Sequence, residues 1–348
     1  MITIPVNTGK PYKVHIDSGI IGTVGNEMKA LGLSGKVLIV SDDNVAPLWL
    51  DTVRTSLTET GFEVHTFVIP HGEGSKSADN LLAILNFAAE NNFSRSDTFI
   101  ALGGGVVGDL CGFAAATYMR GVGFVQIPTS LLAAVDSSVG GKTAIDLAAG
   151  KNLAGAFYQP MLVVCDTDCF STLPECEFSN GMAEVIKYGM FCDSELLDTL
   201  CTDFDISQIV ARCVEIKARV VEADEFEKGE RAFLNFGHTI AHAVELLSGY
   251  AIPHGSAVAA GMVAITKACV KKDICESQAL DILLSLLKKY NLPERFDYSV
   301  DEIYTATLKD KKNSNGRITL VLPTDKGKST LQKCDYDELK EFITLGMN

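Results

Sequence analysis

The sequence of 348 residues predicts an α/β domain followed by an all-α domain. Strand-like and helix-like segments alternate in the first half, and the strands are continuous apolar runs typical of a buried parallel sheet. From Phe178 onward, helical periodicity dominates. Residues 170–177 contain Pro174 and indicate a linker. We therefore expect an α/β domain at 1–177 and a helical domain at 178–348.

The elements are predicted from local patterns in chain order. Residues 2–6 and 12–16 alternate apolar and polar side chains around a polar turn, which predicts an opening hairpin. Further strands are predicted at 36–41, 62–69, 97–102, 124–128, 161–165 and 317–322. Helices are predicted at 47–60, 77–92, from about 109, and at 178–191, 205–225, 234–248, 255–272, 276–290 and 335–345. The alternation of strands and helices in the first half predicts a doubly wound sheet. Sheets of this kind bind ligands at the carboxyl ends of their strands.

Composition excludes several classes of protein. Hydrophobic residues at 47% and charged residues at 21% allow a large core. A net charge of −14 argues against a nucleic-acid surface, which needs basic patches. No apolar run reaches the length of a membrane span, and the first ten residues lack the order of a signal peptide, so we expect a cytoplasmic protein without membrane contact. The ten cysteines form no CxxC pair and are expected to be reduced thiols.

Histidines and one glutamate in the second half suit a divalent metal. His238 and His242 share one face of a predicted helix, and His254 follows 16 residues after His238 in a sequence with six histidines. Glu184 lies on the apolar segment GMAEVIKYGM, where burial of an unpaired carboxylate would be costly. One glutamate with two or three histidines is a ligand set that zinc uses. The alternative, which is the usual case for a lone histidine on an apolar helix, is a hydrogen-bonded core residue.

A glycine-rich turn in the first half predicts a nucleotide site. Gly103, Gly105 and Gly108 form the pattern GxGxxG between a predicted strand and a predicted helix. Backbone amides unobstructed by Cβ atoms can approach a pyrophosphate at a helix N-terminus. The alternative is a tight turn without a ligand. The acidic residue that usually binds the ribose, about 20 positions later, is missing. Asp42, at the end of an earlier strand, is the candidate to bind the ribose instead.

Cations in the first half indicate a site for a small anion. Lys142, Lys151 and Asn152 form a polar group in a neutral stretch, with Arg120 shortly before it. Solvated loops are the alternative for each residue alone, and their clustering favours a basic pocket. Because the nucleotide signals fall in the first half and the metal candidates in the second, we expect a catalytic cleft between the domains.

Seven motifs resemble those of the 3-dehydroquinate synthase family in the same order. They are GGGVVGD, RGVGFVQIPTSLLAAVDSSVGGKT, GKNLAGAFYQP, TLP, GMAEVIKYGM, DEFEKGERAFLNFGHTIAHAVE and PHGSAVAAGM, and the resemblance runs from about Lys36 to Leu322. It implies a Rossmann-like first domain, an α-helical second domain and a homodimer. It also implies an NAD- and metal-dependent enzyme that converts the anionic sugar acid 3-deoxy-D-arabino-heptulosonate 7-phosphate into 3-dehydroquinate and phosphate.

The resemblance also implies residue roles. Glu184, His238 and His254 become ligands of Zn²⁺ or Co²⁺, and His242 becomes a residue that handles protons or hydrogen bonds. Implied substrate residues are Arg120, Asp136, Lys142, Asn152, Lys187, Lys217, Arg231 and Asn235, with Lys311 or Lys312 as a further cation. Implied NAD residues are Asp42, Glu73, Lys76, Gly104, Gly105, Val106, Asp109, Thr129, Ser130, Lys142, Lys151, Thr172, Leu173 and Glu177. Asp146 departs from the family pattern, in which relatives often have asparagine.

Three other functions are open at this point. Another sugar phosphate cyclase, such as a 2-deoxy-scyllo-inosose synthase, would share the metal and nucleotide motifs, but the stretch DSSVGGKT and Asn152 favour a substrate with a carboxylate. An iron-type polyol dehydrogenase would share the two-domain plan and would release NADH. A nucleotide-binding regulator without catalysis would have no need of a buried metal site facing a basic pocket.

Overall fold

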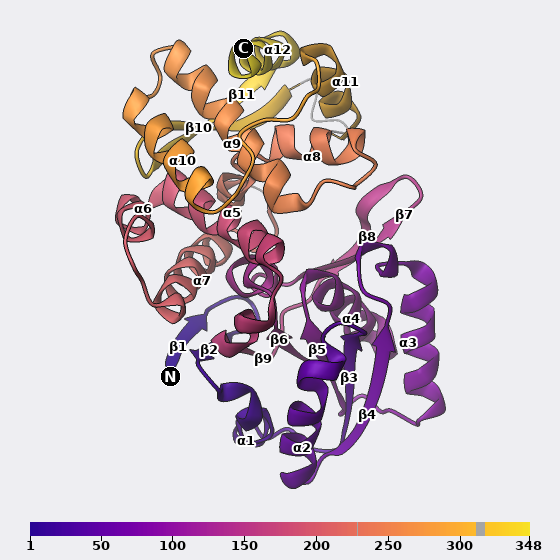
Figure 1. The fold of residues 1–348 in the computed structure, drawn as a ribbon. Coiled ribbons are helices and arrows are strands. Elements are labelled where there is room, and N and C mark those ends of the chain that lie inside the picture. The colour runs from indigo at the N-terminus through magenta and orange to yellow at the C-terminus, as the bar shows by residue number, and fades with distance from the viewer. Residues whose placement is uncertain (228, 311–316) are drawn as a thin grey trace. The chain divides into compact units, whose positions relative to one another are not determined.

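The computed structural model describes residues 1–227, 229–310 and 317–348, and the chain forms two compact units (Figure 1). The first unit comprises Met1–Leu173 and Ile206–Phe226, and the second comprises Pro174–Asp205 and Glu227–Asn348. The first unit is built on a largely parallel sheet and the second is rich in helices. The predicted fold class is therefore confirmed.

A seven-stranded sheet forms the first unit, in the order β1-β2-β9-β6-β5-β3-β4. Its strands are β1 (Ile2–Val6), β2 (Tyr12–Asp17), β3 (Lys36–Asp42), β4 (Glu63–Ile69), β5 (Thr98–Gly103), β6 (Gly123–Pro128) and β9 (Leu162–Asp166). Strand β1 pairs antiparallel with β2, as the opening hairpin predicted, and the other pairings are parallel. The carboxyl ends of six strands consequently meet at one edge of the sheet.

The central strands are continuous apolar runs, so their side chains are apolar on both faces of the sheet. Helices cover these faces. The helices of the first unit are α1 (Val24–Ala30), α2 (Asp51–Glu59), α3 (Ala78–Glu90), α4 (Gly105–Thr117) and α7 (Ile206–Ala223). Short helical turns are η1 (Ile20–Thr23), η2 (Ala46–Leu50), η3 (Glu73–Ser75), η4 (Tyr118–Arg120), η5 (Ala133–Ser137) and η6 (Thr167–Thr172). Leu38 and Val40 of β3 form one core with Ile84 of α3 and Leu110 of α4. This core fixes where α4 begins relative to the strand ends.

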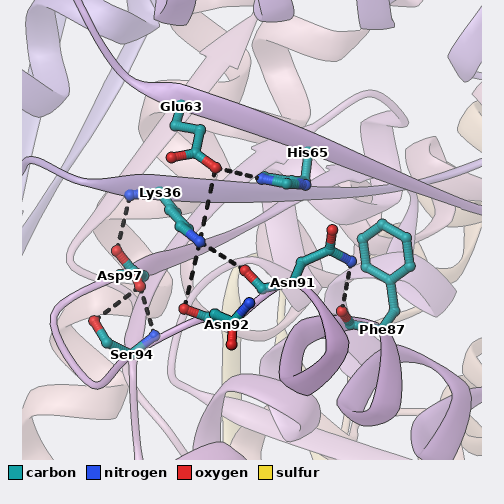
Figure 2. Close-up of polar contacts among 8 residues, drawn as sticks. All are labelled: Lys36, Glu63, His65, Phe87, Asn91, Asn92, Ser94 and Asp97. Carbon is teal, nitrogen blue, oxygen red and sulfur yellow. Dashed lines mark hydrogen bonds and ion pairs between the residues drawn. The ribbon is translucent and has the colours of Figure 1, made fainter.

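A polar cluster ties the amino-terminal ends of three strands together (Figure 2). The Asp97 carboxylate accepts hydrogen bonds from the backbone N–H of Lys36 (2.8 Å) and from the backbone N–H (2.6 Å) and hydroxyl (2.9 Å) of Ser94. The Lys36 ammonium donates to the carbonyl of Asn91 (2.7 Å) and lies 3.7 Å from Glu63. These contacts set the register of β3, β4 and β5 at the edge opposite to their carboxyl ends.

Helix α7 differs from the expected domain division, because it belongs to the first unit although it follows residue 177. It contacts β1, β2 and η5. The Glu222 carboxylate accepts hydrogen bonds from the backbone (2.6 Å) and side-chain (2.9 Å) nitrogens of Asn7, and the Glu225 carboxylate accepts one from the backbone N–H of Gly9 (2.9 Å). Periodicity reveals a helix but does not reveal the sheet that the helix covers, so the sequence could not assign α7.

A two-stranded sheet of β7 (Lys142–Leu147) and β8 (Gly150–Phe157) was not predicted. Its glycine- and alanine-rich second strand lacks the alternation that marks a strand in sequence. The Asp146 carboxylate accepts a hydrogen bond from the backbone N–H of Asn152 (2.8 Å), which has a positive φ of 56°. The Asp146 side chain therefore helps to close this hairpin.

The second unit packs its helices around α9. Its elements are α5 (Glu175–Cys192), α6 (Ser194–Leu200), η7 (Glu230–Asn235), α8 (His238–Leu247), α9 (His254–Lys271), α10 (Ser277–Lys289), α11 (Val300–Asp310), β10 (Arg317–Asp325), β11 (Lys328–Asp335) and α12 (Tyr336–Met347). Helix α9 is almost wholly buried and contacts α5, α8, α10, α12 and β10. The hairpin of β10 and β11 contains the predicted strand and adds a small sheet to the helices. Within the described residues, no helix is both long and apolar enough to span a membrane.

Candidate metal centre and nucleotide-binding edge

Three side chains from three helices of the second unit converge on one point. Glu184 comes from α5, His238 is the first residue of α8, and His254 is the first residue of α9. One ligand atom from each lies within 4.8 Å of the other two. The Nε2 atoms of His238 and His254 lie 3.7 and 3.4 Å from Oε1 of Glu184. Glu184 is fully buried.

This geometry fits a zinc or cobalt ion. Ligands about 2.1 Å from a tetrahedral metal are roughly 3.4 Å apart, which matches the separations between the carboxylate and the two imidazoles. The Nδ1 of His238 lies 3.1 Å from the carbonyl of Phe236, so this nitrogen donates and Nε2 keeps its lone pair for a metal. Three protein ligands of this kind leave a fourth position for substrate.

Glycines allow the three helices to approach closely enough. A Cβ atom added to Gly255 would collide with the backbone of Asn180 in α5, and one added to Gly261 would collide with the backbone of Gly237 before α8. Gly237 has a positive φ of 78°, which favours glycine at the start of α8. Helix α9 thus touches both of its neighbours through backbone, and these contacts place His254 beside Glu184 and His238.

Burial and charge set the protonation of the histidines. Burial lowers the pKa of His238 well below its usual value, and the positive charge of Lys187 lowers this pKa further. A neutral imidazole is the form that binds a metal. Burial also acts to lower the pKa of His254, but hydrogen bonds to Glu184 and Glu245 overcome this effect and raise it to about 10, so that binding of a metal at Nε2 would release a proton.

Two buried cations lie in the second unit. The Lys187 ammonium forms an ion pair with the Glu184 carboxylate, one turn earlier on α5, and both side chains are almost fully buried. Among the residues that the structure describes, Arg231 is the largest side chain that is almost completely buried, and it belongs to η7 together with Asn235. A buried positive charge of this kind can bind the carboxylate or phosphate of a ligand.

In the first unit, the glycine turn lies at the carboxyl edge of the sheet. Strand β5 ends at Gly103, Gly104 caps the helix, and α4 begins at Gly105. The backbone N–H of Thr129, after β6, donates to the carbonyl of Gly103 (3.1 Å). Asp42 ends β3 at this edge, and its carboxylate accepts hydrogen bonds from the next turn. The first amides of α4 lack acceptors within the helix, which suits a pyrophosphate.

A charged network lies beside α4 in the first unit. The Lys76 ammonium is buried 2.6 Å from the Asp109 carboxylate and 3.9 Å from Glu73. The Lys151 ammonium lies 3.6 Å from Glu73. Burial acts to lower the pKa of Lys76, but the charges of the two carboxylates outweigh it and raise that pKa. The lysine therefore stays charged within a carboxylate pair.

The chain resembles one family over almost its whole length. Residues 66–180 match the family described as 3-dehydroquinate synthase N-terminal, and residues 181–313 match the family described as 3-dehydroquinate synthase C-terminal. The 3-dehydroquinate synthase of Pelobacter propionicus is 46% identical over 335 residues, which are 92% of this chain and 93% of that protein. The chain belongs to the 3-dehydroquinate synthase family. The family resemblance found in the motifs is thereby confirmed.

Other relatives agree with this family. The 3-dehydroquinate synthase of Streptococcus suis is 41% identical over 343 residues, 96% of this chain and 97% of its own length. A solved 2-deoxy-scyllo-inosose synthase, complexed with carbaglucose-6-phosphate, NAD⁺ and Co²⁺, has a TM-score of 0.87 at 24% identity and covers 98% of this chain and 99% of its own. A solved 2-epi-5-epi-valiolone synthase from Streptomyces hygroscopicus, with NAD⁺ and Zn²⁺ bound, has a TM-score of 0.87 at 24% identity. It covers 97% of this chain and 97% of its own. These two structures share the fold.

The structure brings several family motif residues together and leaves others apart. His242 lies on α8 with its ring centroid 5.6 Å from that of His238, whereas His254, not His242, joins Glu184 in the triad. Arg120 precedes β6 and therefore lies at the amino-terminal edge of the sheet, away from the glycine turn. Lys311 and Lys312 lie outside the described residues.

Other motif residues form smaller groups. The Lys217 ammonium of α7 donates to the carboxylate (2.8 Å) and backbone carbonyl (2.5 Å) of Asp136 in η5. Lys142 begins β7, and Asn152 lies in the hairpin that β7 forms with β8. The remaining nucleotide candidates lie in the first turn of α4, after β6, in and after η6, and in the first turn of α5: Val106, Ser130, Thr172, Leu173 and Glu177.

Glu245 is a residue of this centre that the sequence analysis missed. Its carboxylate lies 3.4 Å from Nδ1 of His254. It follows His238 by seven residues and His242 by three, so all three share one helical face. A carboxylate on this apolar face is the same signal that singled out Glu184, and it would have found Glu245 as well.

Proposed function

We propose that this chain is a 3-dehydroquinate synthase that converts 3-deoxy-D-arabino-heptulosonate 7-phosphate into 3-dehydroquinate and phosphate. The observation that carries the proposal is the convergence of Glu184, His238 and His254 in a chain whose relatives of this name match over more than nine-tenths of its length. Zinc or cobalt at this centre would act as a Lewis acid on a substrate hydroxyl, and bound NAD would accept and return a hydride.

In the second unit, we infer that the triad and two cations bind substrate. The Lys187 ammonium forms an ion pair with Glu184 and so compensates the cost of burying this carboxylate. Arg231 offers a planar fork of donors that suits a carboxylate or phosphate, and Asn235 follows it in the same turn. His242, packed against His238, is placed to exchange a proton with bound substrate.

In the first unit, we infer that the glycine turn binds NAD. Gly104, Gly105 and Val106 present their amides to the pyrophosphate, and Asp42 at the neighbouring strand end binds ribose. Supporting polar groups at this edge are Glu73, Lys76, Asp109, Thr129, Ser130 and Lys151. We infer further substrate contacts from Asp136, Lys142, Asn152 and Lys217, because a substrate with a carboxylate and a phosphate needs several charged and hydrogen-bonding groups in place of water. The substrate role that the family resemblance implies for Arg120 stays a prediction, since this residue lies at the opposite edge of the sheet.

We also infer a cytoplasmic homodimer, as the family resemblance implies. Sedimentation equilibrium measures the mass in solution. A mass of twice the 37.4 kDa chain supports the dimer, and a single-chain mass contradicts it.

The function is tested by phosphate release from the heptulosonate phosphate, with and without a chelator and with and without NAD. We expect phosphate and 3-dehydroquinate in equal amounts, only when both metal and NAD are present. NAD should act catalytically, so NADH absorbance should not accumulate. Stoichiometric NADH without phosphate release would instead identify a polyol dehydrogenase, and turnover in the presence of chelator would contradict the role of the metal.

A further inference from the structure

Glu245 is a buried carboxylate next to the triad that no step above uses. It lies on α8, with 5% of the residue exposed, among the apolar residues that face α9. One of its carboxylate oxygens lies 3.4 Å from Nδ1 of His254, and the other ring nitrogen of this histidine lies 3.4 Å from Glu184. The His254 ring thus stands between two carboxylates, one at each nitrogen.

The chemistry of Glu184, His254 and Glu245 determines which atom donates each hydrogen bond. An ionised carboxylate only accepts hydrogen bonds, so Nδ1 of His254 donates to Glu245 and its Nε2 is directed toward the triad. His238 is held in the same way, since its Nδ1 donates to the carbonyl of Phe236. The difference lies in the acceptor, because a carboxylate carries a full negative charge that a carbonyl lacks. Such a charge makes the imidazole a stronger metal ligand.

We propose that Glu245 is a positioning residue that orients His254 and strengthens its binding of the divalent metal. The inference rests on the metal centre of the proposed function. Apart from its side chain, Glu245 contributes its backbone carbonyl, which accepts hydrogen bonds from Ser248 (2.9 Å) and Tyr250 (2.7 Å) at the end of α8. These bonds remain when the side chain is replaced.

The test compares the metal affinity of full-length wild type with that of Glu245→Gln and Glu245→Ala. Metal-free protein is titrated with Zn²⁺ in competition with a chromophoric chelator, and Co²⁺ absorption reports the ligand geometry. The amide keeps the volume of the side chain and loses its charge, so we expect affinity to fall about tenfold. Alanine also loses the acceptor, so we expect a loss closer to 100-fold, within the range known for partners of metal ligands.

Asp193→Asn is the matched control. Asp193 is also a buried carboxylate of the second unit, but it accepts a hydrogen bond from the backbone N–H of Leu196 (3.1 Å) at the start of α6. We expect wild-type metal affinity and an unchanged Co²⁺ spectrum in this variant. An equal loss of affinity in Asp193→Asn would show a general effect on folding and would overturn the proposal.

The results for the Glu245 variants and for the wild type distinguish failure of this inference from failure of the proposed function. A wild-type affinity and Co²⁺ spectrum in Glu245→Gln and in folded Glu245→Ala would overturn this inference while leaving the proposed function intact. Absence of Zn²⁺ and Co²⁺ binding in the wild type would overturn both. If Glu245→Ala does not fold, the nearly isosteric Glu245→Gln decides alone.

Discussion

His254 is one of the three proposed ligands of the metal centre. It begins α9, and its Nε2 lies 3.4 Å from Glu184. We expect His254→Ala to weaken Zn²⁺ binding by more than the 10- to 100-fold loss typical of a partner of a ligand, since it removes a ligand outright. His242→Ala should retain the metal. Metal content measured after gel filtration distinguishes the two variants, and a metal-free His242→Ala would contradict the assignment.

Thiol reactivity depends on the burial of each cysteine. Cys176 and Cys201 are exposed, whereas Cys111 and Cys165 are buried, and burial raises the pKa of both buried thiols. Because the thiolate is the reactive form, a raised pKa means less reaction at a given pH. We expect Ellman's reagent at pH 8 to modify Cys176 and Cys201 quickly in the native protein, and Cys111 and Cys165 only after unfolding. Peptide mapping identifies the modified sites, and rapid native labelling of Cys111 would contradict the packing.

At the scale of elements, the approach of α9 to α5 sets the arrangement of Glu184, His238 and His254. Gly255→Ala would place a methyl group against the backbone of Asn180, and neither backbone can yield without moving a helix. We expect a loss of about 1–3 kcal/mol in the free energy of unfolding, together with weaker Zn²⁺ binding. Urea denaturation and metal titration measure the two effects.

Gly22→Ala is the control for this change. A Cβ atom there would lie 3.9 Å from Thr52, an ordinary contact, so stability and metal affinity should remain near wild type. Equal behaviour of the two alanine variants would show that the close contact at Gly255 does not constrain the centre.

The polar cluster in Figure 2 stabilises the sheet at the edge opposite to the proposed nucleotide site. Asp97→Ala would remove an acceptor from the backbone N–H groups of Lys36 and Ser94. We expect a loss of about 1–3 kcal/mol in the free energy of unfolding, with KM for NAD and kcat of the folded enzyme unchanged. Urea denaturation measures the stability and steady-state kinetics measure KM and kcat, and Arg95→Ala is the exposed control. An altered KM for NAD would mean that this edge is coupled to the site.

Local patterns in the sequence predict helices and strands better than they predict which of them pack against each other. The run at 36–41 matches β3 (Lys36–Asp42), because a buried parallel strand needs a continuous apolar segment. The same patterns do not show that α7 covers the first sheet, since its apolar face would fit either unit. They also miss β8, whose glycines and alanines carry no period, and Glu245, whose partner His254 lies on another helix.

At the scale of the whole molecule, the candidate metal site forms only in the folded chain, because its three residues come from three different helices. Sequence reasoning from composition left His238, His242 and His254 as candidates, and only the family resemblance singled out His238 and His254 as the ligands. The structure gives the physical reason, because His254 reaches Glu184 through the glycine contacts of α9, which no local spacing reveals. The roles of the motif residues in the first unit stay predictions.

The most direct test of the account is the position of the metal in a crystal of the Zn²⁺-loaded protein. Anomalous scattering measured on both sides of the zinc absorption edge locates the ion without assumptions about its ligands. The account predicts one strong peak per chain within about 2.0–2.2 Å of ligand atoms from Glu184, His238 and His254. A peak elsewhere, or none at this triad in protein shown to contain zinc, would contradict it.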